Sequence, residues 1–255
     1  MNLLKKSNFV LAVLPLTSPT QSLSTVPSSS RHRSITMSKQ ENSADTTTTE
    51  AKFWDKVAKG YAKKPIDDEA SYQKKLQITQ GYLRPNMKVL EYGCGTGGTS
   101  LIHAPYVKHI LATDISGEMI GIAKKKAKDA KVTNVDFQKA SIDELSIPES
   151  SLDVVLGLSI LHLLPNRQDA IKKTYSWLKP GGLFVTSTGC INDWSIAPLM
   201  KFVAPIGHFF GIFPAFFAFS KKDLINDFRT AGFEIQHEWS PENKRSVFLI
   251  GKKPE

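Results

Sequence analysis

Closely spaced glycines follow a short apolar run in the segment VLEYGCGTGG, residues 89–98, and an aspartate ends the next apolar run. Gly93, Gly95 and Gly97 can adopt positive φ and leave bare backbone N–H groups for a negative group of a ligand. Asp114 ends the second run, where a carboxylate can accept hydrogen bonds from both hydroxyls of a ribose. These residue types in this order predict a site for a nucleoside-containing cofactor.

Two kinds of cofactor fit this pattern. Gly93, Gly95 and Gly98 satisfy the dinucleotide fingerprint G-x-G-x-x-G, and YSWLK at 175–179 has the Tyr-x-x-x-Lys spacing of short-chain dehydrogenases. However, the YSWLK segment lies on an expected helix that ends in LKPGG, and two expected helices precede the glycine turn. The sequence also offers no second domain for a nicotinamide-bound substrate. An NAD(P)-dependent oxidoreductase is therefore the weaker interpretation.

Helix and strand patterns alternate along the chain. Apolar positions at 53, 54, 57, 58 and 61 and a periodic segment at 69–83 predict two helices before the glycine turn. Strands are then expected at 88–93, 109–116, 135–140, 152–159, 183–189, 233–239 and 245–252, with helices at 99–107, 117–130, 166–179 and 220–231. Alternation predicts a parallel sheet covered on both faces, and the short SPENK link requires the last two strands to pair antiparallel. The expected fold is an α/β, doubly wound, Rossmann-like seven-stranded sheet with an antiparallel C-terminal hairpin.

Four segments resemble a known family. VLEYGCGTG resembles motif I of class I S-adenosylmethionine-dependent methyltransferases, and LATDIS followed by EMIGIAKKKA is similar to their second strand and helix. ASIDELSIPESSLDVVLGLSILHLLPN resembles their adenine-binding turn and fourth strand, and LKPGGLFVTS resembles their fifth strand. The resemblance covers residues 53–252. It implies the class I methyltransferase fold and S-adenosyl-L-methionine as the cofactor.

The resemblance also implies the residues that bind this cofactor. They are Tyr61, Glu91, Gly93, Gly95, Gly97, Asp114, Ile115, Met119, Ser141, Ile142, Leu158 and Ser159. The glycine backbone would take the amino and carboxyl ends, Glu91 would support the turn, and Asp114 would take the ribose hydroxyls. Ser141 departs from the pattern, because relatives often carry Asp there. Tyr61 and Met119 are equally compatible with core packing.

Methyl transfer needs a general base where the acceptor loses a proton, as hydroxyls and thiols do. His162 in SILHLLPN follows the fourth strand, where members of the resembled family often carry His. Asp193 and His208 lie in the segment after the fifth strand that commonly forms the acceptor pocket in that family. These three residues are the catalytic candidates, and His162 is equally compatible with a structural role.

The segment between the fifth strand and the next helix is strongly apolar. Residues 196–219, IAPLMKFVAPIGHFFGIFPAFFAF, have the length of a membrane span, but their prolines and glycines, Lys201 and His208 argue against one. We expect residues 192–219 to form an apolar lid of short helices. Such a lid could admit a lipid-like acceptor, support a homodimer or make a peripheral membrane contact.

Charge and cysteine content narrow the function classes. The chain of 255 residues has a formal net charge of +9, but residues 1–40 contain five basic and no acidic residues. The remaining net charge of +4 is mild, so no nucleic-acid partner is expected and a small acidic substrate remains compatible. Cys94 and Cys190 lack metal-ligand spacing, so we expect no metal site and reduced thiols.

The first residues have the composition of a targeting sequence. Residues 1–40 are basic, rich in hydroxyl side chains and free of acid, which indicates a transit peptide. We expect a mitochondrial location, with the plastid as the alternative, and a cytoplasmic one if translation starts at Met37. Residues 41–50 are expected to be a polar linker, and residues 51–255 the methyltransferase domain.

The acceptor is left open between two classes. The Phe-rich lid favours a quinone or phenolic lipid, whereas mild basicity favours a small carboxylate, for example a methylthio hydroxy acid. The methylated atom could be O, S or N. The segment LSILH stands where nucleic-acid methyltransferases usually carry an Asn/Asp-Pro-Pro-aromatic tetrad, which argues against that class. A catalytically silent subunit that binds the cofactor is the remaining hypothesis.

Overall fold

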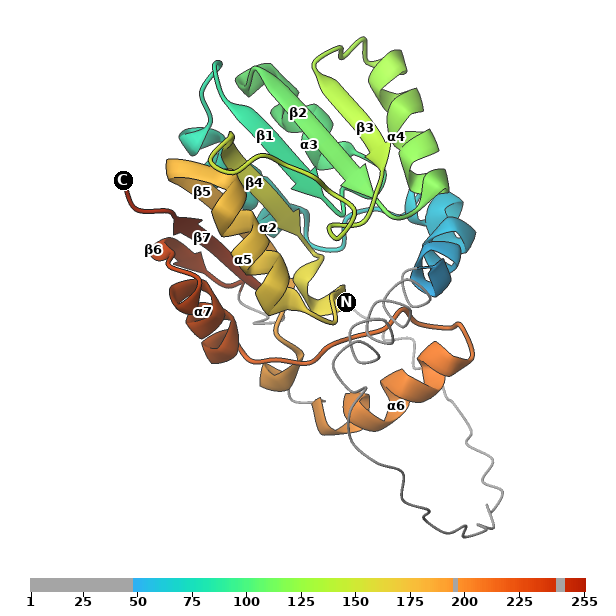
Figure 1. The fold of residues 1–255 in the computed structure, drawn as a ribbon. Coiled ribbons are helices and arrows are strands. Elements are labelled where there is room, and N and C mark those ends of the chain that lie inside the picture. The colour runs from blue at the N-terminus through green and yellow to red at the C-terminus, as the bar shows by residue number, and fades with distance from the viewer. Residues whose placement is uncertain (1–47, 195–196, 242–245) are drawn as a thin grey trace, which may run out of the picture. The chain divides into compact units, whose positions relative to one another are not determined.

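A seven-stranded sheet forms the centre of the protein. In the computed structural model, which describes residues 48–194, 197–241 and 246–255, the strand order is β3-β2-β1-β4-β5-β7-β6 (Figure 1). The strands are β1 (Lys88–Tyr92), β2 (His109–Asp114), β3 (Val135–Lys139), β4 (Leu152–Leu158), β5 (Leu178–Gly189), β6 (Glu234–Trp239) and β7 (Ser246–Lys252). Strands β1 to β5 run parallel, and β7 pairs antiparallel with β5 and β6. The predicted α/β fold and its C-terminal hairpin are confirmed.

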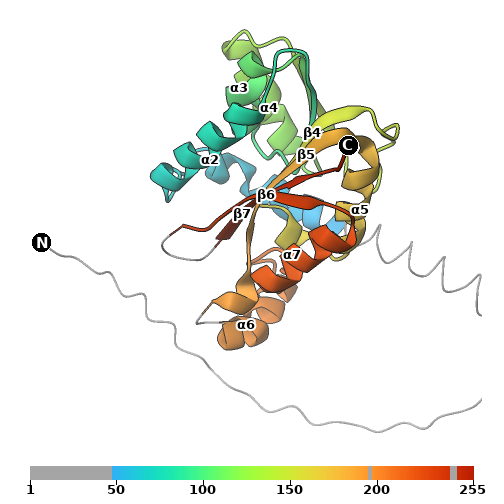
Figure 2. The same ribbon diagram turned by 90° about the vertical axis from the view of Figure 1, so that its left-hand side faces the viewer.

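Helices cover both faces of this sheet. α2 (Glu69–Tyr82), α3 (Gly98–His103) and α4 (Gly117–Asp129) lie on one face, and α5 (Arg167–Trp177) and α7 (Lys221–Thr230) on the other (Figure 2). The buried hydrophobic residues separate into two clusters in the same way, with Val89 in one and Leu90 in the other. Successive side chains of a strand point to opposite faces, so the apolar runs of the central strands supply both cores.

The strand order reverses between β1 and β4. Proteins with an open α/β sheet bind ligands beyond the carboxyl ends of the strands, at the point where the strand order reverses. The turns after β1, β2 and β4 therefore meet at one edge of the sheet, together with two 3-10 turns, η2 (Leu161–Leu163) and η3 (Ile191–Asp193). A third, η1 (Ala104–Tyr106), follows α3.

The boundary between α5 and β5 differs from the prediction. α5 ends at Trp177, and β5 begins at Leu178, which pairs with Leu152 before the register shifts. The segment Pro180-Gly181-Gly182 was expected to lie between helix and strand, but it is an irregular part of the strand. Gly181 has φ +74, a conformation that glycine adopts without the steric cost of a Cβ.

The chain before α2 forms a helix over residues 48–61. Residues 48–50 were expected to be linker, and that part of the prediction is wrong because they form the first turn of this helix. The predicted transit peptide and the rest of the linker lie outside the described residues.

The apolar segment after η3 contains one helix. α6 (Ala197–Phe209) is followed by a turn and an extended stretch that leads to α7 (Figure 1). The lid was expected to consist of several short helices, whereas its described part has a single one. Within the described ranges, no helix combines the length and the apolar character needed to cross a membrane.

Gly97 allows α3 to pack closely against its neighbours. It caps the helix with φ +74, and a Cβ built there would lie 2.7 Å from the Phe137 ring and 2.8 Å from the Ala123 Cβ. Phe137 belongs to β3 and Ala123 to α4. The third glycine of the motif is therefore required by packing as well as by backbone conformation.

Substitution of Gly97 by Ala should lower the free energy of unfolding by about 3 kcal/mol, from left-handed strain and overpacking together. Chemical denaturation measures this loss. The matched control is Gly98→Ala, because a Cβ at Gly98 meets nothing within 4 Å and alanine favours a helix. Equal stability of the two variants would show that the close contact at Gly97 is not a constraint.

Candidate cofactor site

A cavity lies at the carboxyl ends of β1, β2 and β4, where the strand order reverses. Its walls come from the turns after four strands, the helix over residues 48–61 and the extended stretch after α6. The lining residues are Glu50, Trp54, Tyr61, Tyr92, Gly93, Gly95, Asp114, Ile115, Met119, 140–143, 158–160, 163–165, Ala215 and Phe217. Ten of the twelve predicted cofactor residues are among them, and the exceptions are Glu91 and Gly97.

The glycine turn presents bare backbone to this cavity. Gly93 has φ +68 and Gly95 has φ +54, so both adopt the positive φ that the sequence analysis predicted. A Cβ at Gly93 would lie 2.8 Å from the Ile160 side chain, and one at Gly95 would lie 3.9 Å from the Tyr61 ring. Tyr61 therefore faces the turn from the N-terminal helix, across a gap that a side chain at Gly95 would narrow.

Asp114 joins the turns that follow β1 and β2. Its Oδ2 accepts the Gly95 N–H at 2.8 Å, and its Oδ1 accepts the Ser116 N–H at 2.9 Å. Burial raises the pKa of this carboxyl, while the two backbone N–H groups act in the opposite direction. Each carboxylate oxygen can accept more than one hydrogen bond, so Asp114 retains the capacity to accept ribose hydroxyls.

Ser116 connects this corner to the N-terminal helix. Its Oγ–H donates to Asp55 Oδ1 at 2.6 Å, and the same Oγ accepts the Met119 N–H at 3.1 Å. Asp55 also accepts the Glu118 N–H at 3.1 Å, near the first turn of α4. These contacts satisfy free N–H groups of α4 and place Met119 in the cavity wall.

Glu91 lies behind the cavity. Its carboxylate accepts a hydrogen bond from the Ser100 hydroxyl of α3, and burial raises its pKa to about 7. Gly97 likewise packs against β3 and α4. Neither residue is among the described lining residues, so their place in the cofactor site stays a prediction. The contact of Glu91 with α3 agrees with its predicted support of the turn.

The cavity wall near Ile142 contains a polar residue, Asp143, in addition to the predicted Ser141. The Ser141 N–H donates to the Glu144 carboxylate at 2.7 Å, and Ser141 Oγ accepts the Glu144 N–H at 3.3 Å, so Ser141 closes a local turn. Asp143 also lines the cavity and forms an ion pair with Lys173. Asp143 is therefore a second polar candidate for the adenine edge, which the sequence analysis did not select.

None of the three catalytic candidates is among the described lining residues. His162 Nδ1 lies 3.0 Å from Thr188 Oγ, its ring stacks on Phe216, and burial lowers its pKa to about 4. Asp193 accepts the Lys221 N–H at 2.7 Å, at the start of α7. Both side chains contact neighbouring elements and neither is among the described lining residues, so their role towards the acceptor stays a prediction.

His208 lies one contact away from the cavity. Its Nδ1 is 3.5 Å from Oε1 of Glu50, which is itself a lining residue. The same Nδ1 lies 3.4 Å from the Phe213 carbonyl oxygen. The structure therefore places His208 behind Glu50 rather than at the surface of the cavity.

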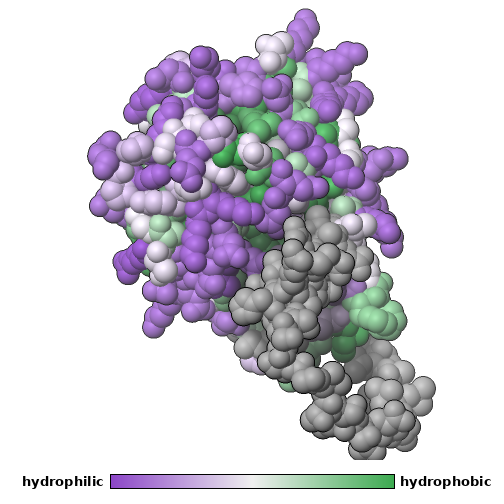
Figure 3. Space-filling model, in the orientation of Figure 1, coloured by the Kyte–Doolittle hydropathy of each residue, from purple (hydrophilic) through white to green (hydrophobic). Residues whose placement is uncertain are grey.

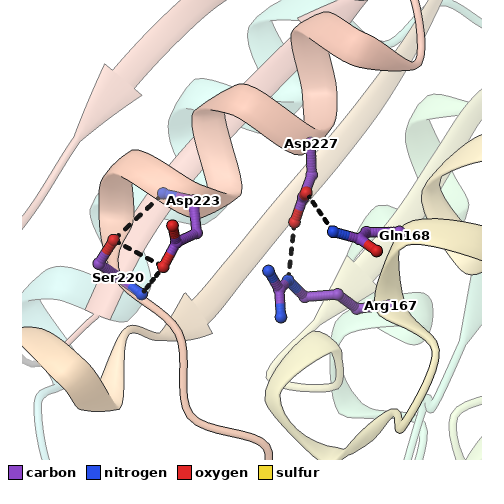
Figure 4. Close-up of polar contacts among 5 residues, drawn as sticks. All are labelled: Arg167, Gln168, Ser220, Asp223 and Asp227. Atoms are coloured by element: carbon purple, nitrogen blue, oxygen red, sulfur yellow. Dashed lines mark hydrogen bonds and ion pairs between the residues drawn. The ribbon is translucent and has the colours of Figure 1, made fainter.

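Ion pairs and caps fix the segment that returns from the cavity to α7 (Figure 4). Asp227 accepts hydrogen bonds from Arg167 Nε at 2.8 Å and Gln168 Nε2 at 2.9 Å, which joins α7 to α5. The Arg167 guanidinium also lies 4.2 Å from the centre of the Phe219 ring. Ser220 and Asp223 form a capping box at the start of α7.

Comparison with known proteins agrees with this geometry. Residues 89–182 match a family model described as a methyltransferase domain. Over 110 residues the chain is 30% identical to an uncharacterized methyltransferase, YcgJ of Bacillus subtilis, a match that covers 43% of this chain and 44% of the relative. The crystal structure of YcgJ superposes with a TM-score of 0.60 at 18% identity, over 72% of this chain and 99% of YcgJ.

Two further relatives differ in their named activities. Phosphoethanolamine N-methyltransferase 1 of Zea mays is 31% identical over 42% of this chain and 22% of the relative. The ubiquinone/menaquinone biosynthesis C-methyltransferase UbiE of Vibrio vulnificus is 27% identical over 43% of this chain and 44% of the relative. The match spans less than half the length of each of these curated relatives.

Residues 89–182 form a methyltransferase domain, and the chain has the fold of class I S-adenosylmethionine-dependent methyltransferases. S-adenosylmethionine is therefore its cofactor, and the charges on the cavity wall fit that molecule. Among the described lining residues, the acidic side chains on the side of the glycine turn and of Ile142 are Asp114 and Asp143, whereas Glu50, the third acid, lies away from that turn. Acidic groups attract the ammonium and sulfonium of S-adenosylmethionine and would repel a pyrophosphate.

Some lining residues that the sequence analysis missed come from segments distant from the strand-end turns. Glu50 was assigned to a linker, and Ala215 and Phe217 belong to a segment with no periodic signal. Trp54 was recognised as apolar, and its spacing from Glu50 and Tyr61 places all three near one face of a helix. That spacing is the signal that could have identified this part of the methyltransferase cavity.

Replacing Asp114 by Ala should raise the dissociation constant of S-adenosylhomocysteine about 30-fold, because a hydrogen bond to a charged group contributes about 2 kcal/mol. Isothermal titration measures the change. Asp129→Ala is the matched control, since Asp129 forms an exposed ion pair with Lys125 on α4. Unchanged affinity in a folded Asp114→Ala variant would remove the ribose assignment.

Proposed function

We propose that this methyltransferase transfers a methyl group from S-adenosylmethionine to a small-molecule acceptor. The observation that carries the proposal is a cavity that combines the bare glycine turn, Asp114 and an acidic wall with a separate apolar end. The bound cofactor supplies an activated methyl group and leaves as a neutral thioether. The chain's own task is to align the acceptor with that methyl and exclude water, and alignment alone can lower the barrier by about 7 to 11 kcal/mol.

The cavity wall favours a neutral, apolar acceptor. Beyond the glycine turn it is formed by apolar side chains, including those of Trp54, Leu163, Leu164 and Phe217. The described lining residues include no Lys, Arg or His. The described part of the wall therefore offers no ion pair to a carboxylate of an acceptor. We therefore propose a quinone or phenolic lipid as the acceptor class, in preference to a small carboxylate such as a methylthio hydroxy acid.

The acceptor class can be tested with labelled donor. The purified chain is incubated with methyl-labelled S-adenosylmethionine and a cell extract, which is then separated into organic and aqueous phases. We expect the label in an apolar product of the organic phase. Label in a small anionic product of the aqueous phase would contradict the proposed acceptor class. Cofactor binding without any transfer would instead support the silent-subunit hypothesis.

α6 carries an exposed apolar surface, part of which Figure 3 shows as hydrophobic residues beside the grey atoms. The exposed residues are Leu199, Phe202, Val203, Ile206, Phe209 and Phe210, and the exposed fraction reaches 82% at Phe209. Their spacing of three and four residues places them on one face of the helix. Single exposed apolar residues are ordinary, but a continuous stripe of this kind marks an interaction site.

Basic side chains lie on the neighbouring helix. Lys52, Lys56, Lys59 and Lys63 are exposed along residues 48–63, at spacings of three and four residues. His208 of α6 lies 3.5 Å from Glu50, so the two helices are neighbours. An exposed apolar stripe on α6, whose neighbouring helix is basic, supports contact with an anionic lipid surface, and peripheral membrane contact through α6 is the partner we propose in preference to a homodimer.

Sedimentation with lipid vesicles tests this contact. We expect the chain to pellet with vesicles that contain an anionic lipid, less with neutral vesicles, and less at high salt. The double variant Phe202→Ser/Phe209→Ser should weaken binding about 1000-fold, because each buried phenyl group contributes about 2 kcal/mol and the two together about 4 kcal/mol. Tyr106→Ser, an exposed aromatic after α3, is the control. A chain that stays in the supernatant and forms a dimer through the same residues would overturn the proposal.

A further inference from the structure

One carboxylate connects the two elements that enclose the apolar end of the cavity. Both carboxylate oxygens of Glu50, in the first turn of the helix over residues 48–61, lie 3.3 Å from the Ala215 backbone N. The Ala215 N–H therefore donates between them, across 165 positions of sequence. The Glu50 side chain is 12% exposed and lines the cavity.

The stretch that receives this contact is itself a cavity wall. Ala215 and Phe217 line the cavity, while Phe216 between them stacks on His162. The Phe217 N–H donates to the His162 carbonyl oxygen at 2.9 Å. Glu50 thus fixes one end of a three-residue wall, and His162 fixes the other.

The charge of Glu50 is costly where it lies. Burial raises its pKa, and the Ala215 N–H and the His208 charge counteract that effect only in part. An apolar side chain of similar size could fill the same space without this cost. What the carboxylate adds is an oxygen acceptor for a backbone N–H that would otherwise lack this partner.

Glu50 is remote from the glycine turn. Tyr61, which faces Gly95, lies eleven residues farther along the same helix, a separation of about 16 Å along its axis. The contact of Glu50 with Ala215 therefore shapes the end of the cavity away from the glycine turn.

We infer that Glu50 is a positioning residue for the methyl acceptor. By binding the Ala215 N–H, it holds residues 215–217 as a wall of the acceptor end and thereby controls acceptor binding, with little effect on cofactor affinity. This inference rests on the proposed methyltransferase function, because the wall has no acceptor to position otherwise.

Two variants separate the hydrogen bond from the charge. Glu50→Gln keeps a side-chain oxygen that can accept the Ala215 N–H, and Glu50→Ala removes it. Hydrogen exchange of peptides covering residues 213–219 reports on that N–H without any acceptor. We expect exchange there to accelerate about tenfold in Glu50→Ala and to be largely restored in Glu50→Gln. Glu149→Ala, an exposed loop carboxylate, should leave it unchanged.

Binding and transfer complete the test. Isothermal titration should give the same S-adenosylhomocysteine affinity for the wild type and both variants, within about twofold. Transfer is then measured with labelled donor and a dilution series of extract. Compared with the wild type, Glu50→Ala should need about tenfold more extract for half-maximal transfer, and Glu50→Gln should need an amount close to that of the wild type. The maximal rate should change little.

The outcomes distinguish this inference from the proposed function. If wild-type protein fails to bind S-adenosylhomocysteine or to transfer label, the methyltransferase proposal fails first. If it does both, but Glu50→Ala leaves the exchange of residues 213–219 unchanged, the inference is wrong. It is also wrong if Glu50→Ala lowers cofactor affinity as strongly as acceptor binding.

Discussion

The Asp114 carboxylate is the constraint on which the rest of the site depends. It accepts one backbone N–H from the turn after β1 and one from the turn after β2, so the two turns cannot move independently. Ser116 donates its N–H to Asp114 and its hydroxyl to Asp55, so the N-terminal helix is held to the same turn. That helix carries Tyr61 across the glycine turn. A single buried acid thereby orders the turns and the helix around the cofactor position.

Burial of several carboxylates near one cavity has an electrostatic cost, and the structure offsets it locally. Asp114 receives two backbone N–H groups, and Glu91, with a pKa of about 7, can remain partly protonated, whereas Asp143 is exposed and pairs with Lys173. The wall left facing the cavity is acidic, and the cofactor of this family brings positive charge. Cofactor and wall therefore complement each other, because opposite charges attract more strongly in a partly buried site than in water.

Local patterns in the sequence predicted the fold and the cofactor end of the site. The strands carry continuous apolar runs, and Gly93, Gly95 and Asp114 stand in short motifs at the ends of two such runs. The acceptor end could not be predicted in this way. Glu50 acquires its role from an N–H 165 positions away, and His162 Nδ1 and Asp193 Oδ2 each have a partner on another element. The start of β5 at Leu178 likewise depends on pairing with β4.

The apolar surface of α6 and the wall of the acceptor end belong to one continuous segment. α6 ends at Phe209, and Ala215 and Phe217 follow within the same segment before Arg167 and the capping box fix it at α7. A shift of α6 would therefore act on the cavity wall through a short stretch of chain whose far end is held. Glu50 and His162 hold that stretch on the cavity side. An apolar acceptor that leaves a lipid surface beside α6 would thus meet the part of the wall that these two residues hold in place.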